Sequence, residues 1–183
     1  MKHFSKILVA AFLLISTSSF GQNLKFGHID LDYLVALMPD RDSAMVKLNA
    51  HAQTLEQTLM DMQSEFQTKY NAFQRQQATW TAVVLETKSK ELQDINNNIT
   101  TFQETASDEL TQMQSALFTP IYQKAQVAIE KIGKEKGLVY IFNTSIRPFL
   151  YVDTNTSEDL LPALRREFGI SADKVPMQLP QQQ

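Results

Sequence analysis

The side chains that could support catalysis are few and widely spaced in this 183-residue sequence. Beyond residue 21 the histidines are His28 and His51, which fall in different predicted elements and lack acidic partners at metal-ligand spacing. The sequence contains no glycine-rich phosphate loop and no serine nucleophile elbow. Asp30 and Asp153 lie at predicted strand ends, where a carboxylate more often caps a turn or pairs with a cation than acts as an acid or base. We therefore expect a non-enzymatic protein with no catalytic, cofactor-binding or metal-binding residues.

A different kind of chemistry is indicated near the middle of the chain, where a cluster of apolar side chains is flanked by basic residues. Apolar side chains beside cations, without a catalytic group, are typical of a surface that makes many weak contacts with other polypeptides. The opposing interpretation is that the apolar residues only pack the local turn onto itself. The residues concerned are Trp80, Val83, Val84, Leu85, Arg75, Lys88 and Lys90.

These side chains must be positioned by the stretch from Asp42 to Leu117, which contains no glycine and no proline. Its apolar residues recur at steps of three and four, which is typical of a helix packed lengthwise on a partner helix. They form two ladders that mirror each other about Val83. The first ladder is Leu48, Ala52, Leu55, Leu59, Met62, Phe66, Tyr70 and Phe73, and the second is Leu92, Ile95, Ile99, Phe102, Ala106, Leu110, Met113 and Leu117.

The mirrored ladders predict an antiparallel coiled-coil hairpin, with residues 41–119 as the arm. We expect Asp42 or Ser43 to cap its first helix, and Thr79 or Thr81 to cap the second after a turn within residues 76–85. Pro120 is expected to end the arm. The alternative is one continuous helix through Val83 that pairs with another chain.

The flanking segments, residues 22–40 and 120–170, are expected to form a base that contains β-strands, so the fold class is α+β and mostly α. Residues 171–183 are rich in proline and glutamine, and we expect them to be disordered. The elements predicted for the base are a strand over 24–32, a helix over 33–38, a helix over 121–132 ended by Gly133 and Gly137, strands over 138–142 and 149–153, and a final helix capped by Ser157.

Residues 1–21 have the pattern of a secretory signal peptide, with two lysines, an apolar run from Ile7 to Ile15 and small residues before Gly21. The alternative is an N-terminal membrane anchor, although the run is shorter than the roughly 20 apolar residues that a membrane span needs. The sequence has no cysteine, which excludes disulfides and thiol chemistry. Without residues 1–21 the chain carries 15 basic against 20 acidic residues, so nucleic acid is not an expected partner.

The order of segments resembles the OmpH/Skp family of periplasmic chaperones. The resemblance is carried by HIDLDYLV at residues 28–35, by the long glycine-free arm, by PIYQKAQVAIEKIGKEKGLVYIF at 120–142, and by FLYVD at 149–153 with SEDLLPALRREFG at 157–169. It implies a periplasmic homotrimer in which strands of three chains form a small β-barrel base. It also implies that unfolded outer-membrane proteins are held between the arms without ATP. The base residues that it implicates are Phe26, Ile29, Leu138, Tyr140, Phe142, Leu150 and Val152.

The charge of the arm departs from the family pattern of strongly basic arms. Residues 41–119 hold six basic and ten acidic residues, with a local excess of cations only near the predicted turn. This balance argues against binding of lipid or lipopolysaccharide and leaves capture of unfolded chains by the arm as the expected activity. The alternative function is that of an exported coiled-coil protein with a structural or tethering role in the cell envelope.

Overall fold

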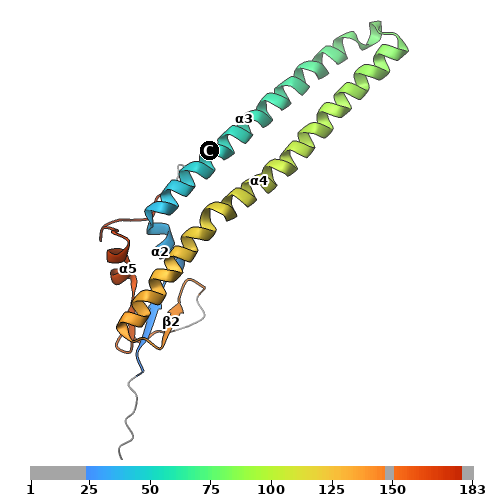
Figure 1. Cartoon of the computed structure of the whole chain (residues 1–183). Helices are drawn as coiled ribbons and strands as arrows, with labels where there is room; N and C mark the ends of the chain where they lie inside the picture. The colour runs from blue at the N-terminus through green and yellow to red at the C-terminus, as the bar shows by residue number, and fades with distance from the viewer. Residues whose placement is uncertain (1–23, 147–150, 179–183) are drawn as a thin grey trace, which may run out of the picture.

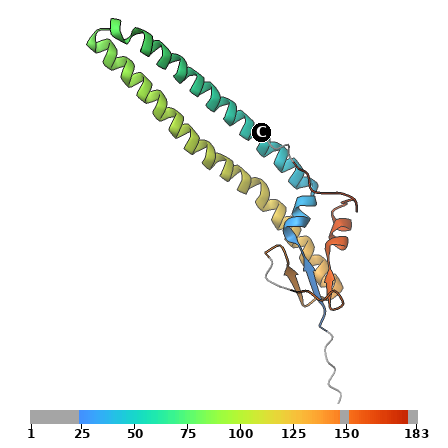
Figure 2. The ribbon, with the colours of Figure 1, turned by 180° about the vertical axis from the view of Figure 1, so that it is seen from behind.

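Two long helices form an arm that projects from a small base built of short helices and strands (Figure 1). The computed structural model describes residues 24–146 and 151–178. The expected signal peptide, Leu150 and the last five residues of the expected tail lie outside the described residues. Figure 2 shows the same arrangement from behind, with the arm projecting away from the base.

The arm consists of α3 (Pro39–Gln76) and the first two thirds of α4 (Ala82–Lys136), joined by the short 3₁₀ helix η1 (Gln77–Thr79). The helices run in opposite directions, because His51 contacts Glu109 and Lys69 contacts Glu91. Each of these pairs is placed symmetrically about Trp80, so the centre of the mirror lies three residues before the predicted Val83. Every residue of the two predicted ladders except Tyr70 is at least partly buried.

The helix ends differ from the prediction in two places. First, α3 begins at Pro39, ahead of Asp42 and Ser43, because proline has no N–H to lose at the first helical position and its fixed φ suits a helix start. Second, α4 continues through Pro120 instead of ending there. Proline removes one intrahelical hydrogen bond, but the next turns bury Ile121, Ala125 and Ala128 in the base, and this packing keeps the helix intact. The boundary predicted at residue 119 therefore falls inside one helix.

The base contains a three-stranded parallel sheet in the order β2-β1-β3. The central strand is β1 (Phe26–Ile29), and its neighbours are β2 (Tyr140–Asn143) and β3 (Ser157–Asp159). Gly27 and Ile29 of β1 are buried, whereas Phe26 and His28 are only partly buried, so one face of the sheet packs on the helices and the other faces outward. Gly137 ends α4 in the left-handed conformation at φ 66°, which lets the chain turn directly into β2.

The core lies between the inner face of the sheet, α2 (Leu31–Leu37), the last turns of α4, and α5 (Leu161–Glu167). Asp30 caps α2 by accepting a hydrogen bond from the backbone N–H of Tyr33 at 2.9 Å, as a turn-capping carboxylate would. The fully buried large side chains come from two short segments that are far apart in sequence: Leu34, Leu37, Met38, Leu160 and Leu164.

The C-terminal part of the base departs furthest from the prediction. Residues 151–153, the described part of the predicted second strand, have no regular structure, and the third strand is formed instead by Ser157–Asp159. Ser157 is thus a buried strand residue rather than a helix cap, and Leu160 precedes α5. Residues 171–178, for which disorder is predicted, contact the start of α3. Lys174 forms an ion pair with Asp42 at 2.7 Å, and the guanidinium of Arg41 donates a hydrogen bond to the carbonyl of Met177 at 2.9 Å.

Candidate functional site

The far end of the arm is closed by Trp80, which follows η1 and packs against the edge of Phe73 with ring centroids 5.5 Å apart. Thr81 caps α4, because its hydroxyl accepts a hydrogen bond from the N–H of Val84. Of the two caps predicted for this helix, Thr79 and Thr81, the structure thus uses Thr81. A small hollow of about 170 Å³ lies beside the indole, between Phe73 and Leu92. Trp80 is therefore partly used to close the turn, as the packing interpretation proposed.

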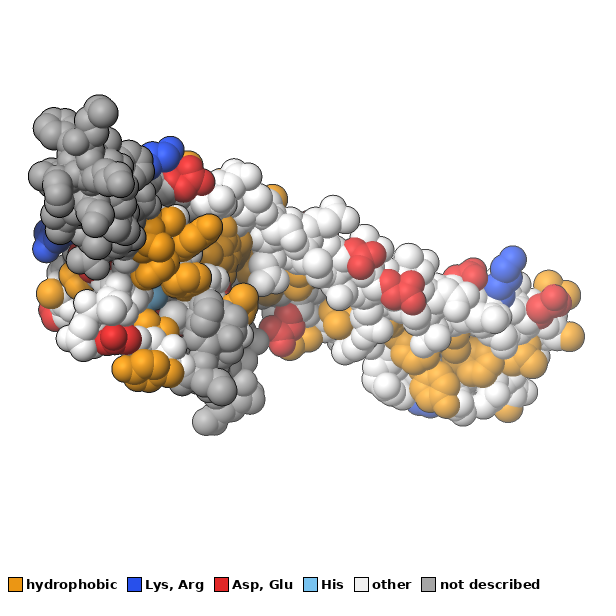
Figure 3. Space-filling view, turned by 90° about the horizontal axis from the view of Figure 1, so that it is seen from below, with side chains coloured by type: hydrophobic (Ala, Val, Ile, Leu, Met, Phe, Trp, Pro, Cys, Tyr) orange, Lys and Arg blue, Asp and Glu red, His pale blue; other side chains and the backbone are white. Residues whose placement is uncertain are grey.

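Three apolar residues in the first turn of α4 remain exposed. Val83 is 73% exposed, Val84 is 39% exposed and Leu85 is 36% exposed. Figure 3 shows apolar side chains gathered toward the far end of the arm and over the base. The structure thus separates the predicted tip cluster into Trp80, which packs on the arm, and Val83, Val84 and Leu85, which face solvent.

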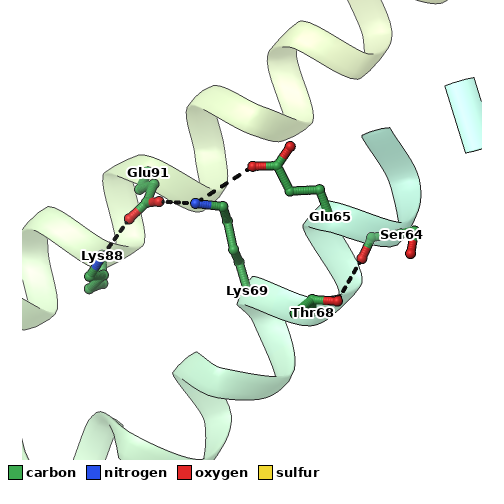
Figure 4. A network of polar contacts seen from close by, with 6 residues as sticks. All are labelled: Ser64, Glu65, Thr68, Lys69, Lys88 and Glu91. Atoms are coloured by element: carbon green, nitrogen blue, oxygen red, sulfur yellow. Dashed lines mark hydrogen bonds and ion pairs between the residues drawn. The ribbon is translucent and has the colours of Figure 1, made fainter. Parts of the chain in front are cut away.

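The predicted cations around the tip have different surroundings. Lys88 and Lys69 both donate to the carboxylate of Glu91, and Lys69 also lies 3.6 Å from Glu65, as the close view in Figure 4 shows. These contacts join α3 to α4 just below the tip. Within the part of the chain that the structure describes, Arg75 and Lys90 form no ion pair. The free positive charge near the tip therefore belongs to Arg75 and Lys90.

The contacts of Lys69 and Lys88 with Glu91, called the Glu91 bridge below, change the pKa of Glu91. Hydrogen bonds from Lys69 and then from Lys88 lower the pKa of Glu91 from 4.5 to about 2, and desolvation opposes this shift. The same hydrogen bond raises the pKa of Lys69. Because the folded-state pKa of Glu91 is depressed, its stabilising contribution is complete above about pH 4.5 and is lost as the pH falls toward 2.

Replacement of Glu91 by glutamine is expected to make the thermal stability of the arm less dependent on pH between about 4.5 and 2. The effect should be small, since all three side chains are partly exposed and screened by water. Melting curves followed by helical ellipticity at a series of pH values measure it. Glu86→Gln is the matched control, because Glu86 is exposed and has no ion pair within the described residues. An equal change in both variants would contradict the role of the Glu91 bridge.

The outer face of the sheet carries a row of aromatic rings. Phe26 lies beside Phe142, and Tyr140 stacks on Phe142, with centroids 6.0 and 6.3 Å apart. Tyr140 is 63% exposed, and β2 is an edge strand. Within the described residues, this is an apolar sheet face that the helices of the chain do not cover.

The other predicted base residues are placed differently. Ile29 is 2% exposed and Leu138 packs against the same core, so both are used inside the chain itself. Val152 is described but lies outside any strand. Of the predicted base residues that the structure describes, Phe26, Tyr140 and Phe142 thus form the outer aromatic face.

The titratable residues singled out in the sequence do not come together. His28 Nδ1 lies 3.0 Å from the hydroxyl of Ser157, linking β1 to β3, whereas His51 pairs with Glu109 on the arm. Asp153 accepts a hydrogen bond from the N–H of Asn155 in a turn, and this hydrogen bond lowers its pKa. In the described ranges, no cluster of histidine, aspartate and glutamate has the geometry to hold a metal ion.

One surface was missed by the sequence reasoning. Two hollows adjoin each other at the root of the arm, and they share Thr111 and Gln114 as lining residues. We call their combined surface the neutral trough, because none of its lining side chains is charged. The signal available in the sequence was the absence of charged residues between Glu109 and Lys124. The trough is lined by Met45, Leu48, Asn49, Ala52, Ser107, Leu110, Thr111, Gln114, Ser115, Phe118, Thr119, Tyr122, Gln123 and Gln126.

Comparison with known protein families identifies the family of this chain. The sequence matches the OmpH family, described as outer membrane protein (OmpH-like), over residues 25–164. The chain belongs to this family. The match confirms the resemblance drawn from residues 28–35, 120–142 and 157–169 and covers both the arm and most of the base.

A solved structure supports the OmpH-like fold. A crystal structure of a proposed OmpH-like outer membrane chaperone from Caulobacter crescentus CB15 is similar, with a TM-score of 0.66 at 13% sequence identity. The similarity covers 87% of this chain and 94% of the other chain. A search of curated proteins finds no match. In the described parts of this OmpH-like chain, no helix combines the length and the apolar character needed to cross a bilayer.

Proposed function

We propose that this OmpH-like protein is a periplasmic, ATP-independent holdase that binds unfolded outer-membrane proteins and prevents their aggregation. The observation that carries the proposal is the long arm of an OmpH family member, which ends in exposed Val83, Val84 and Leu85. Exposed apolar side chains at the end of the arm offer weak, sequence-tolerant contacts to an unfolded chain. Several such contacts together hold a client without burying it in a folded complex.

The holdase is proposed to act as a homotrimer, with the outer aromatic face of the base as the contact between copies. Tyr140 supplies exposed apolar area on the edge strand β2, and Phe26 lies opposite it on the central strand β1. At an edge strand a sheet can be continued or covered by another chain. Three arms would then surround a space for the client. Light scattering with small-angle X-ray scattering tests this assembly. A mass of three chains with a large radius is expected, and a compact monomer would remove the client space.

The decisive assay dilutes a urea-unfolded outer-membrane β-barrel protein into buffer with and without the purified protein. We expect light scattering from aggregates to be suppressed at about one assembly per client, because each client is held apart from the others. No suppression at any salt concentration would contradict the holdase proposal. Recovery of one folded envelope protein in pull-downs, in place of many unfolded barrel proteins, would favour the tethering alternative.

Serine at positions 83, 84 and 85 together is expected to weaken client binding by about tenfold, since each loses apolar contact area worth about 1 kcal/mol or less. Trp80 is left in place because it closes the turn against Phe73. Binding is measured by fluorescence anisotropy of a labelled unfolded client. The control is Val127→Ser, which removes an equally exposed valine from the base end of α4. Equal affinity of the tip variant and the wild type would show that the tip does not contact the client.

A further inference from the structure

The neutral trough consists of two hollows on the same side of the arm root. The first, about 390 Å³, lies between the helices and is lined by four residues of α3 and four of α4, including Met45, Leu48 and Leu110. The second, about 580 Å³, is lined by residues of α4 alone, on the face opposite Pro120. Because Thr111 and Gln114 line both hollows, they form one continuous depression that runs from the arm onto the base.

The lack of charge in the trough is a local property of this side of the arm. A third hollow, lined by α3 and α4 on the other side, includes Asp40, Lys47 and Lys124. Lys124 and Asp40 form an ion pair there at 2.6 Å. The two sides of the same helix pair thus differ in chemistry, and a partner that needs charged contacts would be expected on the other side.

The side chains of the trough can both donate and accept hydrogen bonds. The amides of Gln114, Gln123 and Gln126 each offer an oxygen acceptor and two N–H donors, and none forms a hydrogen bond with the described part of the protein. The hydroxyl of Tyr122 already donates to Asp32 at 3.0 Å, so its ring is the part available to a ligand. This mixture suits the backbone of a polypeptide, which also carries alternating donors and acceptors.

The apolar side chains of the trough add a second requirement for its occupant. Met45, Leu48 and Leu110 line the interhelical hollow, and Phe118 lines the hollow on α4. Methionine adapts to differently shaped side chains, which favours a variable ligand. Phosphate groups of lipids or nucleic acids need basic residues, and the trough supplies none.

The length of the trough fits one extended segment. From Ser107 to Gln126 the helix rises about 28 Å at about 1.5 Å per residue. An extended chain covers this length with about eight or nine residues. A transmembrane β-strand contains about 9–11 residues that alternate between apolar and polar.

We propose that the neutral trough binds an extended, uncharged segment of an unfolded polypeptide, with its backbone paired to the glutamine amides and its apolar side chains in the interhelical hollow. This proposal rests on the holdase function and names the chemistry of the segment that is held. In this proposal, uncharged side chains of the trough bind the client near the root of the arm, in addition to the apolar side chains that bind it at the tip.

Charge substitutions in both directions test the proposal. The double variants Gln114→Lys with Gln123→Lys, and Gln114→Glu with Gln123→Glu, are expected to weaken binding of a urea-unfolded, labelled outer-membrane β-barrel protein by about fivefold or more each. Both signs should weaken it, because either charge must be desolvated against a neutral segment. The control is Gln53→Lys with Gln93→Lys, at exposed arm positions outside the trough. Helical ellipticity should be unchanged in all three variants, since the substituted residues are exposed.

A photoreactive residue at position 114 should crosslink the client, whereas one at Lys47, on the charged side, should not. Wild-type affinity is expected to change less than about twofold between low salt and about 0.5 M salt. If the wild type suppresses aggregation but trough variants bind normally, or if one sign of charge strengthens binding, the trough proposal is wrong and the holdase function stands. If the wild type neither binds the client nor suppresses its aggregation, both proposals fail.

Discussion

Replacing Leu160 with alanine is expected to lower the free energy of unfolding of the base by about 2–5 kcal/mol. The Leu160 side chain is completely buried, and its position is fixed from two sides. Its backbone N–H donates to the carbonyl of His28 at 3.0 Å, at the end of the pairing between β1 and β3. Its side chain packs beside Gly27, where the lack of a Cβ gives it room. Alanine would leave a cavity that the strand and α5 together prevent from collapsing.

The measurement is urea unfolding followed by near-ultraviolet and far-ultraviolet circular dichroism. The near-ultraviolet signal reports packed aromatic rings, both those of the base, such as Tyr140 on Phe142, and Trp80 at the tip of the arm. The far-ultraviolet signal is dominated by the arm helices. Val127→Ala is the control, since Val127 lies at the base end of α4 and is mostly exposed. A loss below about 1 kcal/mol for Leu160→Ala would show that the cluster is not the centre of the fold.

The arm could be predicted from the sequence because its determinants are local. A run without glycine or proline and a repeat of three and four steps are properties of neighbouring residues, and the burial of the ladder residues follows that repeat. The offset of the mirror centre from Val83 to Trp80 has a simple cause. The two ladders mirror each other about Val83 in the sequence, but the register of the helices is set by contacts between them, such as Lys69 with Glu91, and these contacts centre on Trp80.

The base was less predictable because its elements depend on distant partners. The strand Ser157–Asp159 has only three residues, two of them acidic, and such residues have low strand propensity. It exists because β1 pairs with it, more than 120 residues away in the chain. In the same way, Pro120 reads locally as a helix stop, yet burial of Ile121 and Ala125 outweighs the lost hydrogen bond.

The candidate surfaces were also predictable only where they depend on local sequence. The residue types at the tip were visible in the sequence, but the pairing of Lys69 and Lys88 with Glu91 requires the register of the two helices. The neutral trough combines residues 45–52 with residues 107–126, so it appears only when the helices are brought together. The arm carries few free cations and the trough carries no charge, so we expect long-range electrostatic attraction to contribute little to client binding.

Replacing Tyr140 with lysine is expected to convert the proposed trimer into monomers at micromolar concentration. Tyr140 is largely exposed in the single chain, so a lysine there should leave the fold of the base intact. In an assembly through the outer aromatic face, the same lysine would be buried among Phe26 and Phe142 of its own sheet and the surface of another copy. An unpaired buried ammonium costs several kcal/mol, and in a cyclic trimer this cost is incurred at every interface.

Light scattering after size-exclusion chromatography measures the outcome, with Tyr70→Lys as the control because Tyr70 is an exposed arm tyrosine that stacks on Phe66. The control should retain the wild-type mass. A Tyr140→Lys protein that keeps the mass of three chains would exclude the outer aromatic face as the contact. A wild type that is itself monomeric would exclude the trimer.

Monomeric Tyr140→Lys also separates the two parts of the proposed function, because each arm keeps its tip and its neutral trough. If this monomer binds an unfolded client with wild-type affinity, the arm alone accounts for recognition. If its affinity falls by about tenfold or more, clients are bound by several arms at once, and the enclosed space is part of the binding site.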